Sequence, residues 1–478
     1  MPDLIPALPE IVLAAGAMAL LVIGVFAGER SYDLVSWLSA GLLALAFLIL
    51  LYVVPDRAET FAGMFVADQF ALFVKTVILI GGVFALALAG PYLKERSIAR
   101  FEYPVLIVLA LLGMMMMVSA NDLLALYVGL ELQSLSLYVL AAFNRDKLRS
   151  SEAGLKYFVL GALSSGMMLY GISLLYGFAG TTGFTALATA ASAAGTSEIG
   201  LTIGLVFLIS GFAFKVSAVP FHMWTPDVYE GSPTPVTAFF AIAPKVAAMA
   251  LFVRAMSVAF PDLIEAWRQI VMFIAVASML LGAFAALAQT SIKRLMAYSS
   301  IAHMGYALTG LAIGTVEGVQ GVLVYLAIYM LMSAGTFALI LSMRRKDGLT
   351  EDIEDLAGLA KTRPAMALAM AIMMFSLAGI PLLAGFFAKL YVFLAVVEAG
   401  YYWLAVVALV TSVVGAVYYL RIVKLMYFDA PSEAFVAPRH RGINTVATVS
   451  AVLNSPVHLA LIWPLTMAAG AAAQSLFP

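Results

Sequence analysis

Ionisable side chains interrupt long apolar stretches of this sequence, where a charge is costly and usually serves a function. Five such residues stand out: Glu131, Lys215, Lys245, His303 and Lys389. A carboxylate, an imidazole or an amine in a hydrated path can bind and release a proton. Spread over five separate apolar segments, these residues predict a row of proton-transfer sites at mid-membrane depth, linked by water.

Glu131 belongs to a polar stripe. Tyr127, Glu131, Ser134 and Tyr138 are spaced so that they lie on one face of a helix. The stripe has two interpretations. The glutamate either joins two helices through hydrogen bonds or exchanges protons while facing a lysine.

Two of the three lysines lie near predicted helix breaks. Lys215 precedes Pro220, whereas Lys245 directly follows a proline in the middle of the eighth span, with apolar turns on both sides. Lys389 follows the break at residues 379–381. Proline removes an amide donor and leaves a carbonyl without its hydrogen bond. Within the membrane, backbone with unpaired groups is tolerated only where it contacts protein or water. A lysine there can be hydrated and can lose its proton, although a side chain that snorkels to the surface remains the alternative for Lys215.

His303 shares a predicted helix face with Ser299 and Tyr306. It is either a packing histidine held by hydrogen bonds or a relay, because an imidazole titrates near neutral pH. The sequence leaves both interpretations open.

Other polar residues have open roles. Lys75 either pairs with a neighbouring helix or has a function, and Lys156 either snorkels or has a function. His222, Asp227 and Glu230 either line an access route or belong to a solvated loop.

Composition places the chain in a membrane. Of its 478 residues, 64% are hydrophobic and 11% are charged, and the mean hydropathy is +1.03; soluble domains carry about 25% charged residues. The net charge of −1 does not suggest nucleic acid as a partner. The absence of cysteine excludes disulfides and cysteine-ligated iron–sulfur clusters, and four scattered histidines do not suggest a haem or metal site.

The apolar stretches predict an all-α polytopic membrane protein with about fourteen transmembrane helices. A helix needs about 20 apolar residues to cross the hydrocarbon layer. Continuously apolar runs such as residues 41–51 do not fit the alternating pattern of a membrane β-barrel. The first stretch lacks a basic leader region, so we expect a retained helix. The predicted spans are 8–28, 34–54, 66–91, 102–119, 122–143, 153–179, 199–220, 235–257, 264–288, 292–314, 318–343, 365–398, 402–428 and 451–474.

Loop charges predict the orientation, because lysine and arginine favour the inner side. With fourteen spans and both termini outside, the outer connections hold only Arg57, Arg254 and Arg268. The inner connections carry the larger set: Arg30, Lys94, Arg96, Arg100, Arg145, Lys147, Arg149, Lys293, Arg294, Arg344, Arg345, Lys346, Lys361, Arg363, Arg421, Lys424, Arg439 and Arg441. This asymmetry supports the span count as well as the orientation.

The spans contain a weak internal repeat. Residues 211–215 (GFAFK) resemble residues 385–389 (GFFAK), and the two segments cross in opposite senses. Inverted repeats with interrupted helices are typical of transporters. We therefore predict broken helices 7 and 12 and four parts: an N-terminal three-helix segment (1–101), two inverted five-helix repeats (102–257 and 258–428), and a C-terminal connection with helix 14 (429–478).

Several segments carry a family resemblance. They are Leu130–Leu135 with Tyr138, Phe214–Lys215, Pro220–Gly231, Pro233–Phe239, Ala243–Lys245, Lys293–Tyr306, Ala378–Pro381 and Gly385–Lys389. On these residues the chain resembles the subunit N family of the bacterial proton-pumping NADH:quinone oxidoreductase, respiratory complex I, which is one of its antiporter-like subunit families. The Pro-Lys pair at 244–245 and the Gly-Phe-Phe-x-Lys segment set subunit N apart from its sister families. Typical members read Ile-Pro-Pro where this sequence has Ile380-Pro381-Leu382, a departure that preserves the break and alters its geometry.

The resemblance implies roles and partners. Glu131 and Lys215 would form a coupled pair, Lys245 a central connector, and His303 with Lys389 the outer half-channel. The chain itself would hold no cofactor, while FMN, iron–sulfur clusters and quinone would belong to partner subunits.

The implied partners are other membrane-arm subunits of the complex, including neighbouring antiporter-like and small membrane subunits, together with membrane lipids. The implied location is the bacterial inner membrane, with multiple spans and both termini in the periplasm. The alternative is a subunit of a multisubunit cation/proton antiporter.

Overall fold

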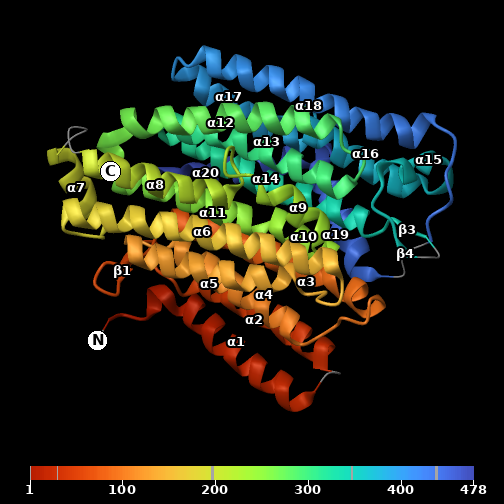
Figure 1. The fold of residues 1–478 in the computed structure, drawn as a ribbon, viewed down its shortest axis with the longest axis horizontal. Coiled ribbons are helices and arrows are strands. Elements are labelled where there is room, and N and C mark those ends of the chain that lie inside the picture. The colour runs from red at the N-terminus through yellow and green to blue at the C-terminus, as the bar shows by residue number, and fades with distance from the viewer. Residues whose placement is uncertain (1, 29–30, 195–198, 346–347, 437–439, 478) are drawn as a thin grey trace.

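The computed structural model describes residues 2–28, 31–194, 199–345, 348–436 and 440–477. Three cations of the predicted inner face, Arg30, Lys346 and Arg439, lie outside these ranges. The described chain is a bundle of helices that run mainly along its long axis (Figure 1). The all-helical prediction is therefore confirmed.

The helices of the first part are α1 (Leu8–Ala27), α2 (Tyr32–Tyr52), α3 (Gln69–Glu95), α4 (Glu102–Val118), α5 (Leu123–Ala141), α6 (Leu148–Ala179), α7 (Phe184–Ala194), α8 (Ile199–Val216), α9 (Trp224–Gly231), α10 (Thr234–Ala241) and α11 (Ala243–Arg254). The second part contains α12 (Ile264–Leu287), α13 (Ile292–Ile313), α14 (Val316–Ile340), α15 (Leu359–Thr362), α16 (Pro364–Ala378), α17 (Ala384–Glu398), α18 (Tyr402–Phe428), α19 (Arg441–Asn454) and α20 (Leu459–Gln474). Two short antiparallel hairpins pair β1 (Ala58–Thr60) with β2 (Phe65–Ala67) and β3 (Arg344–Arg345) with β4 (Gly348–Leu349).

Eleven helices of the described residues are long and apolar enough to cross a membrane. The three other predicted spans also contain helices, but these helices are not among the eleven. Helix α4 has only 17 residues, and α13 carries Lys293 and Arg294 in its first turn. The third span is divided into the shorter helices α16 and α17. The count of fourteen therefore stays a prediction.

The predicted breaks in helices 7 and 12 are confirmed. In helix 7 the α-helix α8 ends at Val216, inside the predicted span, and the chain continues beyond the span as α9; helix 12 is divided between α16 and α17. Positive φ angles mark both breaks, at Ser217 (62°), Gly379 (86°) and Leu382 (72°). Only glycine takes such angles readily. A proline at position 382 could not adopt this φ, so the departure from Ile-Pro-Pro gives the second break its own geometry.

Two predicted spans were wrong in detail. Span 235–257 is interrupted at Ile242, between α10 and α11, because Pro244 follows and cannot donate an amide hydrogen bond. Span 451–474 begins inside α19 and is interrupted around Pro456, before α20. Helices α7, α9 and α15, the start of α19 and both hairpins were not predicted.

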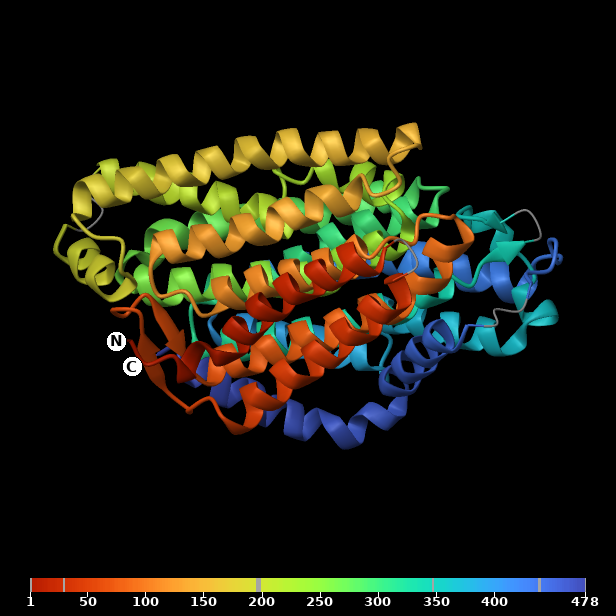
Figure 2. The ribbon, with the colours of Figure 1, turned by 90° about the horizontal axis from the view of Figure 1, so that it is seen from below.

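The two ends of the bundle differ in content. At one end, Asp3 accepts a hydrogen bond from Thr60 of β1 (2.5 Å), and Ser475 accepts one from the amide of Phe70 (3.1 Å), so the described chain ends meet there (Figures 1 and 2). The hairpin of β3 and β4 lies at the opposite end. We call this opposite end the basic end, because it carries Arg96, Lys147, Arg149, Lys293 and Arg345.

Arg254 corrects the charge analysis. It was assigned to an outer connection, but it closes α11 and is only 2% exposed. Its guanidinium binds both carboxylate oxygens of Asp68 at 2.7 and 2.8 Å. A second buried ion pair joins Lys75 of α3 to Glu10 of α1 at 2.5 Å, which is the helix-pairing interpretation of Lys75.

We expect Arg254→Met to destabilise the subunit strongly, because the substitution leaves the Asp68 carboxylate buried without its partner. Breaking a buried pair in this way costs about 3–5 kcal/mol. The amount of chain found in assembled complex after membrane solubilisation measures the effect. Lys94→Met is the matched control, since its pair with Asp33 is exposed and is worth about 0–1 kcal/mol. Equal assembly of the two variants would contradict this assignment.

Candidate functional site

The carboxylate of Glu131 lies half-buried on α5. The hydroxyl of Ser165, on α6, donates a hydrogen bond to it and also lies 3.3 Å from the hydroxyl of Tyr127. The polar stripe predicted for α5 thus faces a polar residue of the next helix. This contact fits both a structural and a proton-exchanging glutamate.

Lys215 lies at the end of α8 and is buried. Its ammonium donates a hydrogen bond to Ser134 of the same α5 stripe at 2.7 Å, and Ser134 donates to the carbonyl of Leu130 at 2.6 Å. Lys215 and Glu131 interact electrostatically, but no direct ion pair joins them in the described part of the chain. Lys215 therefore does not contact Glu131 directly. It binds Ser134, which lies on the same face of α5 as Glu131.

Lys245 occupies the break between α8 and α9. Its ammonium donates to the carbonyl of Val216, at 3.2 Å, and to the hydroxyl of Ser217. It also lies 5.4 Å from the ring centroid of Trp224. A helix leaves its last carbonyls without amide partners and carries partial negative charge there, so the cation stabilises the interrupted helix.

Lys389 uses the same arrangement at the second break. Its ammonium donates to the carbonyls of Leu377 and Ala378, at the end of α16, at 3.1 and 2.9 Å. A third hydrogen bond reaches the hydroxyl of Ser412 on α18, at 2.8 Å. The GFAFK likeness would pair Lys215 with Lys389, whereas by contact Lys245 is the counterpart of Lys389.

His303 is buried within a group of tyrosines. Its Nδ1 lies 2.5 Å from the hydroxyl of Tyr325, and its Nε2 lies 3.2 Å from the hydroxyl of Tyr419. Tyr419 also contacts Ser299 at 2.5 Å, so two members of the predicted face share one partner. Tyr306 connects this group to Lys389, whose ammonium lies 5.2 Å from the Tyr306 ring centroid.

The five predicted residues therefore form two groups. Glu131, Lys215 and Lys245 surround the first break, while His303 and Lys389 lie together near the second. Beside His303 lie four buried hydroxyls that interact with one another: Tyr229, Ser300, Tyr329 and Ser333. We call them the hydroxyl cluster. Buried polar groups of this kind commonly bind ordered water.

The second break depends on a close approach at Gly385. A Cβ there would lie 1.8 Å from the carbonyl oxygen of Ser376, whose hydroxyl accepts the Gly385 amide at 2.9 Å. Gly385→Ala would force α17 away from α16 and move Lys389 off its carbonyls.

For the proton pumping that the family resemblance implies, we expect at least a tenfold loss in Gly385→Ala, measured in membrane vesicles that contain equal amounts of the assembled complex. Gly177→Ala, on α6, is the control, because no atom of the described residues lies within 4 Å of the added methyl group. Wild-type pumping in both variants would refute the role of this contact.

The polar connection after α8 leads to the basic end. Asp227 binds Lys156 at 2.9 Å and Arg294 at 2.8 Å, and Glu230 binds Arg294 at 3.0 Å. Lys156 also pairs with Glu152 at 2.8 Å. Cations therefore hold both Asp227 and Glu230 in place.

The sequence analysis missed several partners of the five residues. Ser165, Ser217 and Ser412 bind Glu131, Lys245 and Lys389. Three tyrosines around His303, namely Tyr325, Tyr329 and Tyr419, and the burial of Lys293 were also missed. A usable signal existed, since Tyr325 and Tyr329 lie four residues apart, on one face of an otherwise apolar helix.

Sequence comparison places this chain in a known family. Residues 120–415 match the family model described as NADH:quinone oxidoreductase/Mrp antiporter, TM. The chain is 57% identical over 477 residues to NADH-quinone oxidoreductase subunit N of Parvibaculum lavamentivorans, and the alignment covers 100% of this chain and 98% of the relative.

Solved structures show the same fold. A chain of respiratory complex I from Thermus thermophilus with bound aureothin has a TM-score of 0.81 and 33% identity, with 95% of this chain and 98% of that chain covered. A chain of the Mrp complex from Dietzia sp. DQ12-45-1b has a TM-score of 0.84 and 23% identity, with 98% and 97% covered. The second likeness concerns the fold alone. The chain belongs to the NADH-quinone oxidoreductase subunit N family.

Proposed function

We propose that this chain is a membrane-arm subunit of NADH:quinone oxidoreductase and translocates protons through Glu131, Lys215, Lys245, His303 and Lys389. One observation carries this proposal: buried lysines donate hydrogen bonds to the last carbonyls of two interrupted helices. These carbonyls can accept a hydrogen bond from the neutral amine as well as from the ammonium. Such a lysine can therefore release and regain a proton while the backbone at the break keeps its structure.

Charge coupling would drive the transfer. Quinone reduction in a partner subunit changes the field at Glu131, and an opposite charge within about 4–6 Å stabilises a protonated lysine. Weakening this interaction lets Lys215 release its proton toward Lys245. Water at the hydroxyl cluster would carry the proton to His303 and Lys389.

The redox chemistry belongs to other subunits in this proposal. FMN, iron–sulfur clusters and quinone would be bound by the partners, and this chain would be non-redox. The neighbours would include antiporter-like and small membrane subunits, with lipids around the exposed apolar helices.

We further propose the predicted division into residues 1–101, 102–257, 258–428 and 429–478. Packing supports it, because α4 packs on α5 as α12 packs on α13, and α6 packs on α8 as α14 packs on α17. We call residues 102–257 the first half and residues 258–428 the second half. The basic end would face the cytoplasm and both termini the periplasm of the bacterial inner membrane.

A cation/proton antiporter subunit is the second candidate, and the fold shared with the Mrp chain favours it. It is weaker, because the chain is 57% identical over 477 residues to a subunit N relative but only 23% identical to the Mrp chain.

Affinity purification of the tagged chain from solubilised membranes tests the proposal. We expect flavin and iron–sulfur subunits to copurify and deletion of the gene to abolish membrane NADH:quinone reductase activity. Loss of sodium tolerance with unchanged reductase activity would instead establish the antiporter.

A further inference from the structure

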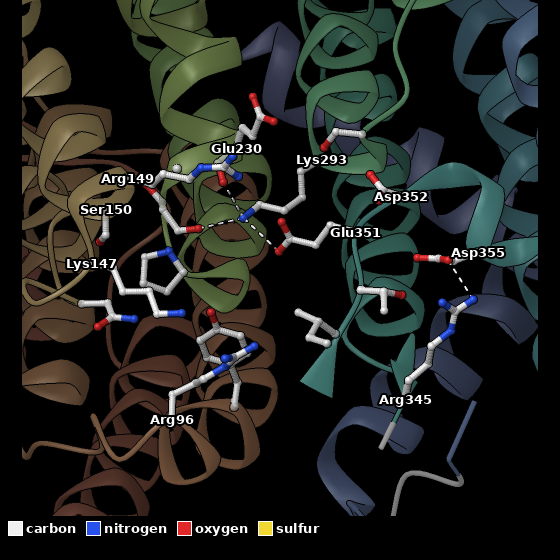
Figure 3. A pocket seen from close by; sticks show the side chains of 18 residues that line it. Arg96, Lys147, Arg149, Ser150, Glu230, Lys293, Arg345, Glu351, Asp352 and Asp355 are labelled. Carbon is white, nitrogen blue, oxygen red and sulfur yellow. Dashed lines mark hydrogen bonds and ion pairs between the residues drawn. The ribbon is translucent and has the colours of Figure 1, made fainter. Parts of the chain in front are cut away.

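A polar cavity of about 530 Å³ lies at the basic end, between the two halves (Figure 3). Arg96, Lys147 and Arg149 occupy the side formed by the N-terminal segment and the first half. The facing side belongs to the second half and contains Glu351, Asp352 and Asp355, the last paired with Arg345 at 2.7 Å. A cavity with this many charged groups is accessible to water. It reaches between the halves from the surface.

Lys293 closes the cavity on its inner side. Its side chain is 3% exposed, and its ammonium donates to the carbonyls of Glu230 and Ser232 at 2.9 and 2.8 Å. It also forms an ion pair with Glu351 at 3.2 Å (Figure 3). Lys293 is thus a third buried lysine on the last carbonyls of a helix, here α9. It joins the first half to the second.

Glu351 is the member of this pair that meets water. Its side chain is 31% exposed and accepts a hydrogen bond from Thr234 of α10 at 2.8 Å. Its backbone is fixed independently, because the carbonyl of Glu351 accepts the amide of Ile292 at 2.9 Å. The carboxylate can therefore change its charge while the chain around it stays in place.

The hydroxyl cluster lies beyond Lys293. Ser300 is seven residues, or about two turns, along α13 from Lys293 and shares its face. Ser300 interacts with Tyr229 of α9 and Tyr329 of α14, and the Tyr329 ring centroid lies 5.2 Å from that of His303. The cavity, the ion pair, the cluster and the histidine thus follow one another along the interface between the halves.

We propose that Lys293 and Glu351 form a gate that admits protons from the cavity at the basic end to the hydroxyl cluster and His303. This inference rests on the proposed function. A hydronium ion in the cavity gives its proton to the Glu351 carboxylate and becomes water. The neutral acid no longer holds Lys293, the ammonium shifts, and Glu351 passes the proton to water at the cluster. The carboxylate then binds Lys293 again.

Water access to Ser300 tests the gate directly. The chain has no cysteine, so Ser300→Cys places a single thiol on it. In the intact complex in membranes, we expect Glu351→Gln to raise the labelling rate of this thiol by methanethiosulfonate ethylammonium at least tenfold. Glu354→Gln is the matched control, because Glu354 is exposed in the same loop, and it should leave the rate unchanged.

Passive proton flux provides a second measurement that needs no cysteine. Proteoliposomes carrying the complex with Glu351→Gln or Lys293→Met should dissipate an imposed pH gradient at least twofold faster than wild type without NADH. Lys293→Arg keeps the cation and should restore the wild-type rate. Unchanged labelling and unchanged flux would overturn the gate.

The two proposals fail separately. Unchanged labelling and flux together with lost pumping in Lys215→Ala would refute the gate alone. Faster labelling together with wild-type pumping in Lys215→Ala would refute the pumping function and leave the gate as a structural water barrier.

Discussion

Lys215→Ala is expected to abolish proton-pumping-coupled quinone reduction, lowering it at least tenfold while the complex still assembles. The ammonium is the only group through which α8 reaches the α5 stripe at Ser134 in the described hydrogen bonds. Alanine removes both the proton site and the interaction with Glu131. Glu131→Ala should have the same consequence, because it removes the charge that controls the lysine.

Membrane vesicles with equal amounts of assembled complex provide the measurement, with NADH oxidation and quenching of a pH-sensitive dye followed together. Lys424→Ala is the control, since Lys424 is 69% exposed and pairs only with Asp429 in the described structure. We expect it to remain within twofold of wild type. Wild-type pumping stoichiometry in both Lys215→Ala and Glu131→Ala would exclude the two residues from the route.

Two substitutions of Lys389, to alanine and to arginine, should distinguish a structural role of this residue from a proton-transfer role. In Lys389→Ala, the carbonyls of Leu377 and Ala378 lose their buried donor, and each such group costs about 1–3 kcal/mol. We therefore expect poor assembly as well as lost pumping. Lys389→Arg retains a cation on these carbonyls but cannot release a proton in a protein.

The arginine variant should therefore assemble and fail to pump, with a loss of at least tenfold. Blue native electrophoresis measures assembly, and dye quenching in vesicles measures pumping. If Lys389→Arg assembles and pumps like wild type, Lys389 only stabilises the break.

The sequence could predict the helices and the ionisable residues because both depend on local signals. Apolar runs of about 20 residues located the spans, and the prolines at 220 and 381 indicated two breaks. The break at Ile242 was missed because apolar residues continue on both sides of Pro244, so the segment resembled one uninterrupted span. Helix α9 was missed because its eight residues are too short for a clear periodic pattern.

Tertiary contacts could not be predicted in this way. The sequence suggested that Lys215 faces Glu131, but Ser134 takes the hydrogen bond, because it lies one turn further along the same helix face. Nothing local indicates that Lys245 lies against Val216, 29 residues earlier, or that Tyr419 contacts His303 across 116 residues. These contacts follow from how the helices pack.

The pairing of Lys293 with Glu351 illustrates the same limit. Lys293 was counted as an inner-face cation, the kind that usually remains solvated, and only the fold shows that its ammonium is buried under the carbonyls of α9. Sequence-based charge counting therefore does not reveal whether a single cation is buried.

The central claim is that protons cross this chain through lysines that release them between the two halves. The most direct test is the number of protons translocated per NADH oxidised by purified complex carrying Lys245→Arg in proteoliposomes. The arginine keeps a cation against Val216 but cannot deprotonate, so we predict a ratio below that of wild type in fully assembled complex. A wild-type ratio at wild-type turnover would contradict the proposal that protons pass through Lys245.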